Sequence, residues 1–206
     1  MPERYQRQSA LAPLGIEARA LTAGAEAGVV LCERTPGTQI VIRGNAEDER
    51  FRKDVADILG LDVPVRPKTA STKAGKSLLW LGPDEWLAVM EADAAAELCA
   101  RLDAALDELH HAVVDVSHSR AVIGLAGANA RDVLMKGTNI DLHPRQFGVD
   151  SCMQARLARA HMLLHQLDDS PRYELYVHRS FAIYAWNWLC DAAGEYGLRV
   201  LGGDQH

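Results

Sequence analysis

Residues 113–148, VVDVSHSRAVIGLAGANARDVLMKGTNIDLHPRQFG, decide how this chain folds. The stretch opens with β-branched valines, which favour a strand over 113–116. The valine run ends at Asp115, Ser117 and His118. The short side chains of aspartate and serine bond readily to nearby backbone groups. The sequence therefore predicts that the strand ends in a tight polar turn.

A second strand and a short helix follow this turn. Apolar residues alternate at Ala121, Ile123 and Leu125, which predicts a strand with one buried face. Gly127 and Gly137 then bracket a segment so short that its helix needs tertiary packing to be stable.

The composition is that of a globular protein. The 206 residues are 48% hydrophobic with a net charge of −6, which argues against nucleic acid or an anionic membrane as partner. No apolar run approaches the ~20 residues of a membrane span, and residues 1–11 are too polar for a signal peptide. The cysteines are scattered, which predicts reduced thiols in a cytoplasmic protein. They are Cys32, Cys99, Cys152 and Cys190.

Turn and capping signals divide the first half of the chain into strands and helices. A strand is predicted over 38–43, followed by a helix with Asn45 as its N-cap and with Glu47 and Asp48 in its first turn. Gly60 is expected to end this helix. The next predicted elements are a proline-containing loop over 61–77 and a hairpin with strands over 78–81 and 86–90.

The second half repeats this alternation. Asp93 is expected to cap a helix, residues 155–167 are expected to run extended, and Ser180 is expected to cap a last helix that ends at Gly194. The other predicted elements are strands over 112–116, 120–125, 173–177 and 200–201 and a helix near 128–136. The sequence thus predicts an α+β fold of mostly antiparallel sheet with packed helices. Two small lobes, 1–148 and 149–206, or one compact unit fit this pattern.

Two patterns suggest nucleotide or metal chemistry and are better explained otherwise. KAGKS at 73–77 resembles the end of a phosphate-binding loop, but the required earlier glycine is Ala70 and a strand is predicted to follow. A flexible cationic loop is expected instead. His161 and His165 lie on a segment predicted to be extended, about 13 Å apart, so one zinc ion with ~2.1 Å bonds cannot join them. No metal site is predicted.

The remaining candidates are the polar turn and the tryptophans. Asp115, Ser117 and His118 are the three residue types of a hydrolase triad. Triad members normally come from separate elements, however, so we expect a structural turn and no catalytic residue. Trp188 falls on the predicted inward stripe of the last helix. Trp186 lies two positions away, which predicts that it faces a partner interface.

Ordered motifs along the chain resemble a known family. D-V-S-H at 115–118, ANARDVLMKG at 128–137 and the acidic NIDL loop resemble the folate-binding aminomethyltransferase fold of the glycine-cleavage T-protein. The longer run IDLHPRQF, LGPDEWL at 81–87 and RQSALAP at 7–13 are similar to the gamma subunit family of heterotetrameric sarcosine oxidase. This resemblance spans most of the chain.

The resemblance implies a function for the complex. Such an enzyme oxidises sarcosine with oxygen to glycine and hydrogen peroxide and passes the one-carbon unit to tetrahydrofolate. FAD, FMN and NAD are expected on the alpha and beta subunits and zinc on the delta subunit, with no cofactor on this chain. The gamma subunit is then expected to be a non-catalytic scaffold, mainly against the folate-binding part of alpha.

An alternative remains a free-standing folate-binding or one-carbon-transfer protein that uses Asp115 and His118. It predicts a preformed, partly apolar cavity beside these residues. The family's usual D-V-S-H-M-G has Ser119 and Arg120 here in place of the methionine and glycine, which disfavours this alternative. The subunit interpretation predicts a large exposed apolar patch, which a third possibility, a homo-oligomer, would bury against itself.

Overall fold

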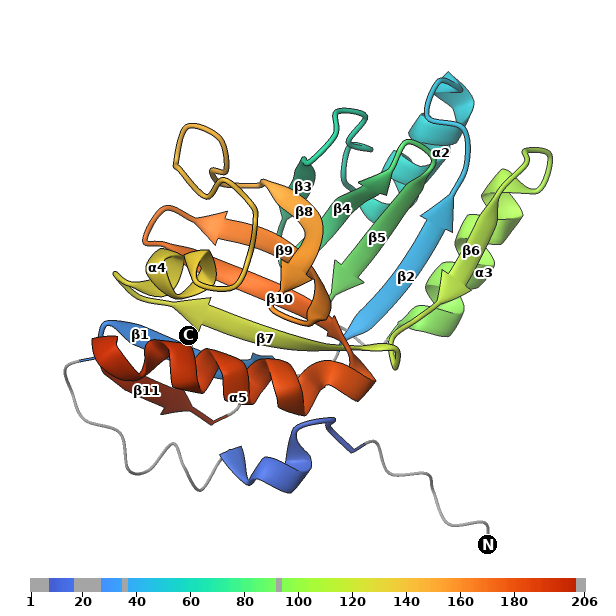
Figure 1. Cartoon of the computed structure of the whole chain (residues 1–206). Helices are drawn as coiled ribbons and strands as arrows, with labels where there is room; N and C mark the ends of the chain where they lie inside the picture. The colour runs from blue at the N-terminus through green and yellow to red at the C-terminus, as the bar shows by residue number, and fades with distance from the viewer. Residues whose placement is uncertain (1–7, 17–26, 35–36, 92–93, 203–206) are drawn as a thin grey trace, which may run out of the picture.

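A computed structural model of the chain describes residues 8–16, 27–34, 37–91 and 94–202, and its strands form two sheets (Figure 1). In spatial order the six-stranded sheet contains β11 (Leu198–Leu201), β1 (Val29–Arg34), β7 (Arg120–Ala126), β10 (Arg172–His178), β9 (Ala160–Asp168) and β8 (Cys152–Leu157). The five-stranded sheet contains β3 (Ala70–Lys73), β4 (Lys76–Gly82), β5 (Glu85–Met90), β2 (Thr38–Arg43) and β6 (Ala112–Asp115).

Helices cover the outer face of each sheet. The helices are α2 (Glu49–Leu59), α3 (Ala95–Leu106), α4 (Ala130–Met135) and α5 (Ala182–Ala193), with short 3-10 turns η1 (Ala12–Leu14), η2 (Arg179–Phe181) and η3 (Gly194–Tyr196). The helices α4 and α5 share one apolar core with the six-stranded sheet, and α2 and α3 share another with the five-stranded sheet (Figure 1). A third, smaller cluster joins the two sheets. Its buried members are Leu79, Leu87, Val122, Cys152, Leu163 and Tyr176.

The predicted α+β class is confirmed, since β1 and β11 pair in parallel and the other strand pairs are antiparallel. The boundary predicted at Gly148 does not separate the two sheets, because β1 and β7 precede it and pair with strands that follow it. None of the helices within the described ranges is long and apolar enough to cross a lipid bilayer.

The first helix begins later than predicted. Its N-cap is Asp48, whose carboxylate accepts from the backbone N–H groups of Arg50 and Phe51, so Asn45 is not the cap. Asn45 instead accepts from the N–H of Glu47 in the preceding turn. The predicted end is confirmed, because Gly60 has a φ of 73° and its N–H closes the helix. The N-cap position of α3 is Ala94, and Asp93 lies outside the described residues.

Three strand predictions need correction. The strand β7 is buried on both faces, because helices cover one face and the five-stranded sheet approaches the other. The extended segment predicted over 155–167 is two strands, β8 and β9, which turn at Ala158 (φ 51°). The loop predicted over 61–77 contains β3, and KAGKS is its hairpin turn into β4.

The helix between Gly127 and Gly137 is confirmed as α4. Gly127 has a φ of 110°, and an added Cβ would lie 2.4 Å from the carbonyl oxygen of Gly28, so the turn into α4 requires glycine. Gly137 allows close approach to the ring of Trp188, which would lie 2.4 Å from an added Cβ.

The prediction for Trp186 is wrong. This side chain is fully buried in the core between α5 and the six-stranded sheet, whereas Trp188 is half-buried. The helix begins at Ala182 with Phe181 as N-cap, and Ser180 lies in η2. The buried stripe of α5 is therefore Ala182, Ala185, Trp186, Leu189 and Ala193.

Candidate functional site

The D-V-S-H segment forms a structural turn after β6. The Asp115 carboxylate accepts from the backbone N–H and the hydroxyl of Ser117, at 2.9 and 2.5 Å. The Ser117 oxygen in turn accepts from the N–H of Gln39 at 3.0 Å, which links the turn to β2. Ser117 is 1% exposed and its hydroxyl is committed to these contacts. The expectation of a backbone-bonded turn is therefore confirmed.

Replacing Asp115 with asparagine is expected to lower the free energy of unfolding by about 1 kcal/mol, because the two bonds to Ser117 lose their charged acceptor. Urea denaturation measures this cost. Asp62→Asn, at an exposed position after α2, is the matched control and should change stability little. Equal stability of the Asp115 variant and the native chain would show that these bonds do not hold the turn.

A preformed cavity lies between the two sheets, away from the predicted position. It encloses about 330 Å³, at the small end for ligand sites. Its polar lining includes Arg34, Arg172, Glu174 and Tyr176 of the six-stranded sheet, Gln39, Thr72 and Ser77 of the other, and Glu91 just after β5. A second cavity of about 320 Å³ continues along β1 and β7 and shares Arg34, Arg172 and Glu174 with the first. Asp115 and His118 line neither of these two cavities.

A buried charge network occupies the wall of this inter-sheet cavity. Arg34 Nε lies 3.3 Å from Glu174 Oε1, and the Tyr176 hydroxyl donates to Glu174 Oε2 at 2.5 Å. Burial, together with the adjacent Glu174 charge, raises the pKa of Tyr176 well above its ordinary value. Tyr176 therefore stays protonated and acts as a hydrogen-bond donor, and the network fixes the spacing of β1 and β10.

The side-chain amide of Gln39 faces the same cavity. Gln39 is 1% exposed, and neither its amide nitrogen nor its amide oxygen has a hydrogen-bond partner in the structure. A buried amide without partners costs free energy, so this position can accept both a donor and an acceptor from a small polar group. Neither Gln39 nor Glu174 was singled out from the sequence, because each stands alone in an apolar strand.

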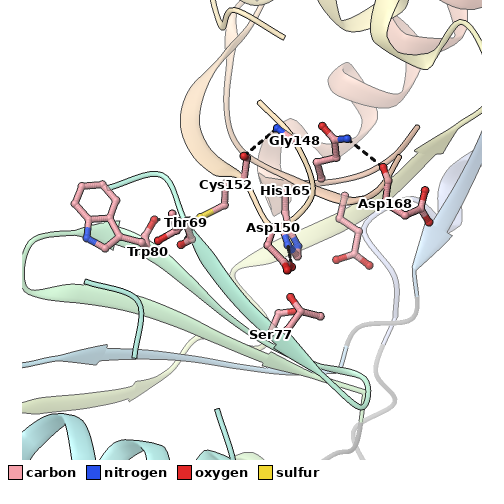
Figure 2. A network of polar contacts seen from close by, with 12 residues as sticks. Thr69, Ser77, Trp80, Gly148, Asp150, Cys152, His165 and Asp168 are labelled. Carbon is pink, nitrogen blue, oxygen red and sulfur yellow. Dashed lines mark hydrogen bonds and ion pairs between the residues drawn. The ribbon is translucent and has the colours of Figure 1, made fainter. Parts of the chain in front are cut away.

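A second polar network ties the two sheets together at β8 and β9 (Figure 2). His165 is fully buried, and its Nε2 lies 3.8 Å from Asp150 Oδ1. This contact with His165 lowers the pKa of the Asp150 carboxyl. Cys152 Sγ donates to the carbonyl oxygen of Thr69 at 3.2 Å and lies 3.6 Å from that of Trp80. The contacts run from β8 to β4, so they hold the sheets in place.

The two histidines considered for metal binding are separated in environment as well as in sequence. His161 is exposed at the start of β9, and His165 is buried further along the same strand. Within the described ranges, no group of three or more metal-ligating side chains gathers.

Cys152 is expected to resist alkylation in the folded protein. Burial raises the pKa of its thiol from 9.0 to about 12, so at pH 8 it has about a thousandfold less thiolate than an ordinary cysteine. Iodoacetamide labelling followed by mass spectrometry measures the rate, with the urea-unfolded chain as the control. Labelling of Cys152 as fast as that of half-buried Cys190 would contradict this prediction.

The same thiol makes stability depend on pH. Since the pKa of Cys152 is raised in the folded chain, its contribution to stability is complete below pH 9 and is lost as the pH rises towards 12.

Comparisons with known proteins agree with the motifs. The pattern that defines the family "Sarcosine oxidase, gamma subunit family" matches residues 43–195. The sarcosine oxidase subunit gamma of Corynebacterium sp. (strain P-1) is 37% identical over 181 residues, 87% of each chain. That of Corynebacterium sp. (strain U-96) is 32% identical over 191 residues, 92% of this chain and 91% of the relative.

Solved structures show the same relationship. One chain of the heterotetrameric sarcosine oxidase from Corynebacterium sp. U-96, in complex with pyrrole 2-carboxylate, superposes with a TM-score of 0.82 at 31% identity. The match covers 92% of this chain and 96% of that chain. Aminomethyltransferase T of the glycine cleavage system from Bartonella henselae has a TM-score of 0.60 at 15% identity, covering 93% of this chain and 51% of that chain, and shares the fold.

Proposed function

This chain belongs to the sarcosine oxidase gamma subunit family, and from this we propose that it is the non-catalytic gamma subunit of a heterotetrameric sarcosine oxidase, an oxidoreductase. The near full-length structural match to a chain of such a heterotetramer is the observation that carries the proposal. The complex oxidises the N-methyl group of sarcosine while oxygen is reduced to hydrogen peroxide. Glycine is released, and the one-carbon unit passes to tetrahydrofolate as 5,10-methylenetetrahydrofolate.

In this proposal the redox chemistry resides on partner subunits. FAD, FMN and NAD belong to alpha and beta, and zinc to delta. The gamma chain scaffolds the assembly, mainly against the folate-binding part of alpha. Asp115 and Ser117 of the D-V-S-H turn bond to the backbone N–H groups of Ser117 and Gln39. This structural use of their side chains is consistent with a non-catalytic role.

An exposed apolar surface on α5 supports a partner contact. Phe181, Ile183 and Tyr184 are 42%, 39% and 37% exposed at the beginning of this helix. Aromatic side chains are enriched at interface centres because they bury a large area with little loss of conformational entropy. This surface, which we call the α5 apolar patch, takes the place of the contact predicted at Trp186.

Co-expression with the candidate alpha, beta and delta chains tests the proposal. An affinity-purified gamma chain should retain three other chains by mass spectrometry, and the eluate should show a flavin absorption spectrum. A colourless, lone chain that binds tetrahydrofolate would contradict the proposal and favour the free-standing transfer protein.

The double variant Phe181→Asp, Ile183→Asp is expected to weaken assembly about tenfold or more, because charges would replace apolar area in the contact. Quantitative co-purification measures the loss, and circular dichroism verifies that the chain is folded. Val65→Asp, at an exposed valine in the segment before β3, is the matched control and should assemble normally. Equal recovery of all three chains would show that the α5 apolar patch is not the contact surface.

A further inference from the structure

Four basic side chains form a row across the six-stranded sheet. Arg120 on β7 is paired with His178 on β10, and Arg156 on β8 is paired with His161 on β9. The register of β10 and β9 continues this line and places His178 beside His161. Since these strands are neighbours in the order β7, β10, β9, β8 (Figure 1), the four residues form one line, the basic row.

The basic row lies on the face of the six-stranded sheet that is turned towards the five-stranded sheet, at one end of its strands, where Arg120 is half-buried and the other three side chains are exposed. Along a strand every second side chain shares a face. Arg120 shares its face with Val122, and His161 shares its face with Leu163, both members of the apolar cluster between the sheets. All four basic residues line a cavity of about 300 Å³. The end of β4 closes one side of it, where Gln154 Nε2 donates to the carbonyl oxygen of Leu81 at 3.0 Å.

None of the described residues that line this cavity is acidic, although the whole chain carries a net charge of −6. Among the described residues, no carboxylate forms an ion pair with any member of the basic row. The arginines of the other inter-sheet cavity differ, since Arg34 pairs with Glu174 and Arg172 with Asp168.

Arg120 is the most enclosed charge of the row. Burial lowers the pKa of its guanidinium, and the charge of Glu85 opposes this effect at longer range. Arg120 Nη1 donates a long hydrogen bond of 3.4 Å to Ser119 Oγ. Arg120 is thus a half-buried cation that has one long hydrogen bond and only the opposing charge of Glu85, an arrangement that costs free energy.

We propose that the basic row is an oxyanion-binding site, which takes a carboxylate or phosphate group between Arg120 and Arg156 with His161 and His178 as further donors. Guanidinium groups recognise carboxylate and phosphate oxygens through paired N–H donors, and an anion there would offset the cost of the half-buried Arg120 charge. The anion is either a free small molecule or an acidic side chain of a partner subunit, since both present the same oxygens.

Binding by the purified full-length chain tests the site independently of any assembly. Isothermal titration with inorganic phosphate and with citrate, at constant ionic strength, should show one saturable site. The double variant Arg120→Gln, Arg156→Gln should weaken this binding about tenfold or more. Arg66→Gln, Arg101→Gln removes two exposed arginines elsewhere and is the charge-matched control that should bind normally. Circular dichroism and thermal unfolding verify that each variant is folded. If the double variant unfolds, the titration is repeated with Arg156→Gln alone, because this position is exposed.

The same titration on the assembled complex distinguishes the two sources. If a partner carboxylate fills the site, binding of free phosphate and citrate disappears on assembly and the double variant assembles poorly. If the ligand is a free small anion, binding persists in the complex. Binding of both anions that is equal in the double variant and its control, together with normal assembly of the double variant, would overturn the proposal.

Discussion

Replacing Trp186 with alanine is expected to lower the free energy of unfolding by about 3–5 kcal/mol, the cost typical of truncating a buried tryptophan. Its side chain is 0% exposed and packs in the core between α5 and the six-stranded sheet. Truncation removes this burial and leaves a large hole, which the flanking Ala182 and Ala185 are too small to fill. Guanidinium unfolding followed by far-UV circular dichroism measures the loss.

Two further variants isolate the cause. Trp186→Phe is expected to cost much less than the alanine variant, because it refills most of the hole and the indole N–H has no hydrogen-bond partner to lose. Trp188→Ala removes the half-buried neighbour and is also expected to cost less. If Trp186→Ala were as stable as the native chain and only failed to assemble, the side chain would face a partner after all.

The same tryptophan shows where sequence periodicity is limited. Residues 181–193 are apolar on much of the helix surface, so more than one stripe can be taken as the inward face. The predicted stripe, which includes Phe181 and Trp188, places Trp186 outside, whereas the observed stripe, which includes Ala182, buries it. The turn η2 occupies 179–181 instead, and the helix begins one residue later than its capping signal indicates.

Elements that end at glycine, proline or aspartate could be predicted from the sequence. The β4–β5 hairpin follows from apolar strands around Gly82, Pro83 and Asp84, and the end of α2 follows from Gly60, because these residues favour turn or left-handed backbone. The turn between β8 and β9 has no such signal, since Ala158 adopts a positive φ with neither glycine nor proline beside it. Tertiary pairing of the two strands imposes that turn.

The inter-sheet cavity could not be predicted, because its residues come from distant strands. Arg34 and Glu174 meet only when β1 and β10 flank β7, and their separation in sequence gives no indication of this contact. Within YELYV, Glu174 fits the solvent-facing position of an alternating strand. It is buried because the sheet has a layer on both faces, and the same arrangement makes the prediction of a single buried face for β7 wrong.

Replacing Glu174 with alanine is expected to lower the free energy of unfolding by about 3 kcal/mol, because removing one partner leaves a buried charge uncompensated. Arg34 and the Tyr176 hydroxyl both lose their Glu174 contacts. The expected cost is at the low end for buried pairs, since Glu91 lies 3.6 Å from Arg34 and retains part of its pairing. Urea unfolding at pH 7 measures it.

A combined replacement shows whether charge or shape causes the loss. The triple variant Arg34→Met, Glu174→Leu, Tyr176→Phe removes every polar group of the network and keeps its volume, so most of the lost stability should return. If the stability returns, the polar network lowers the stability of the fold relative to an apolar packing. Such a cost is expected when polar groups line a cavity that binds a ligand. A triple variant as unstable as Glu174→Ala would instead show that these hydrogen bonds contribute net stability to the packing of β1 and β10 across β7.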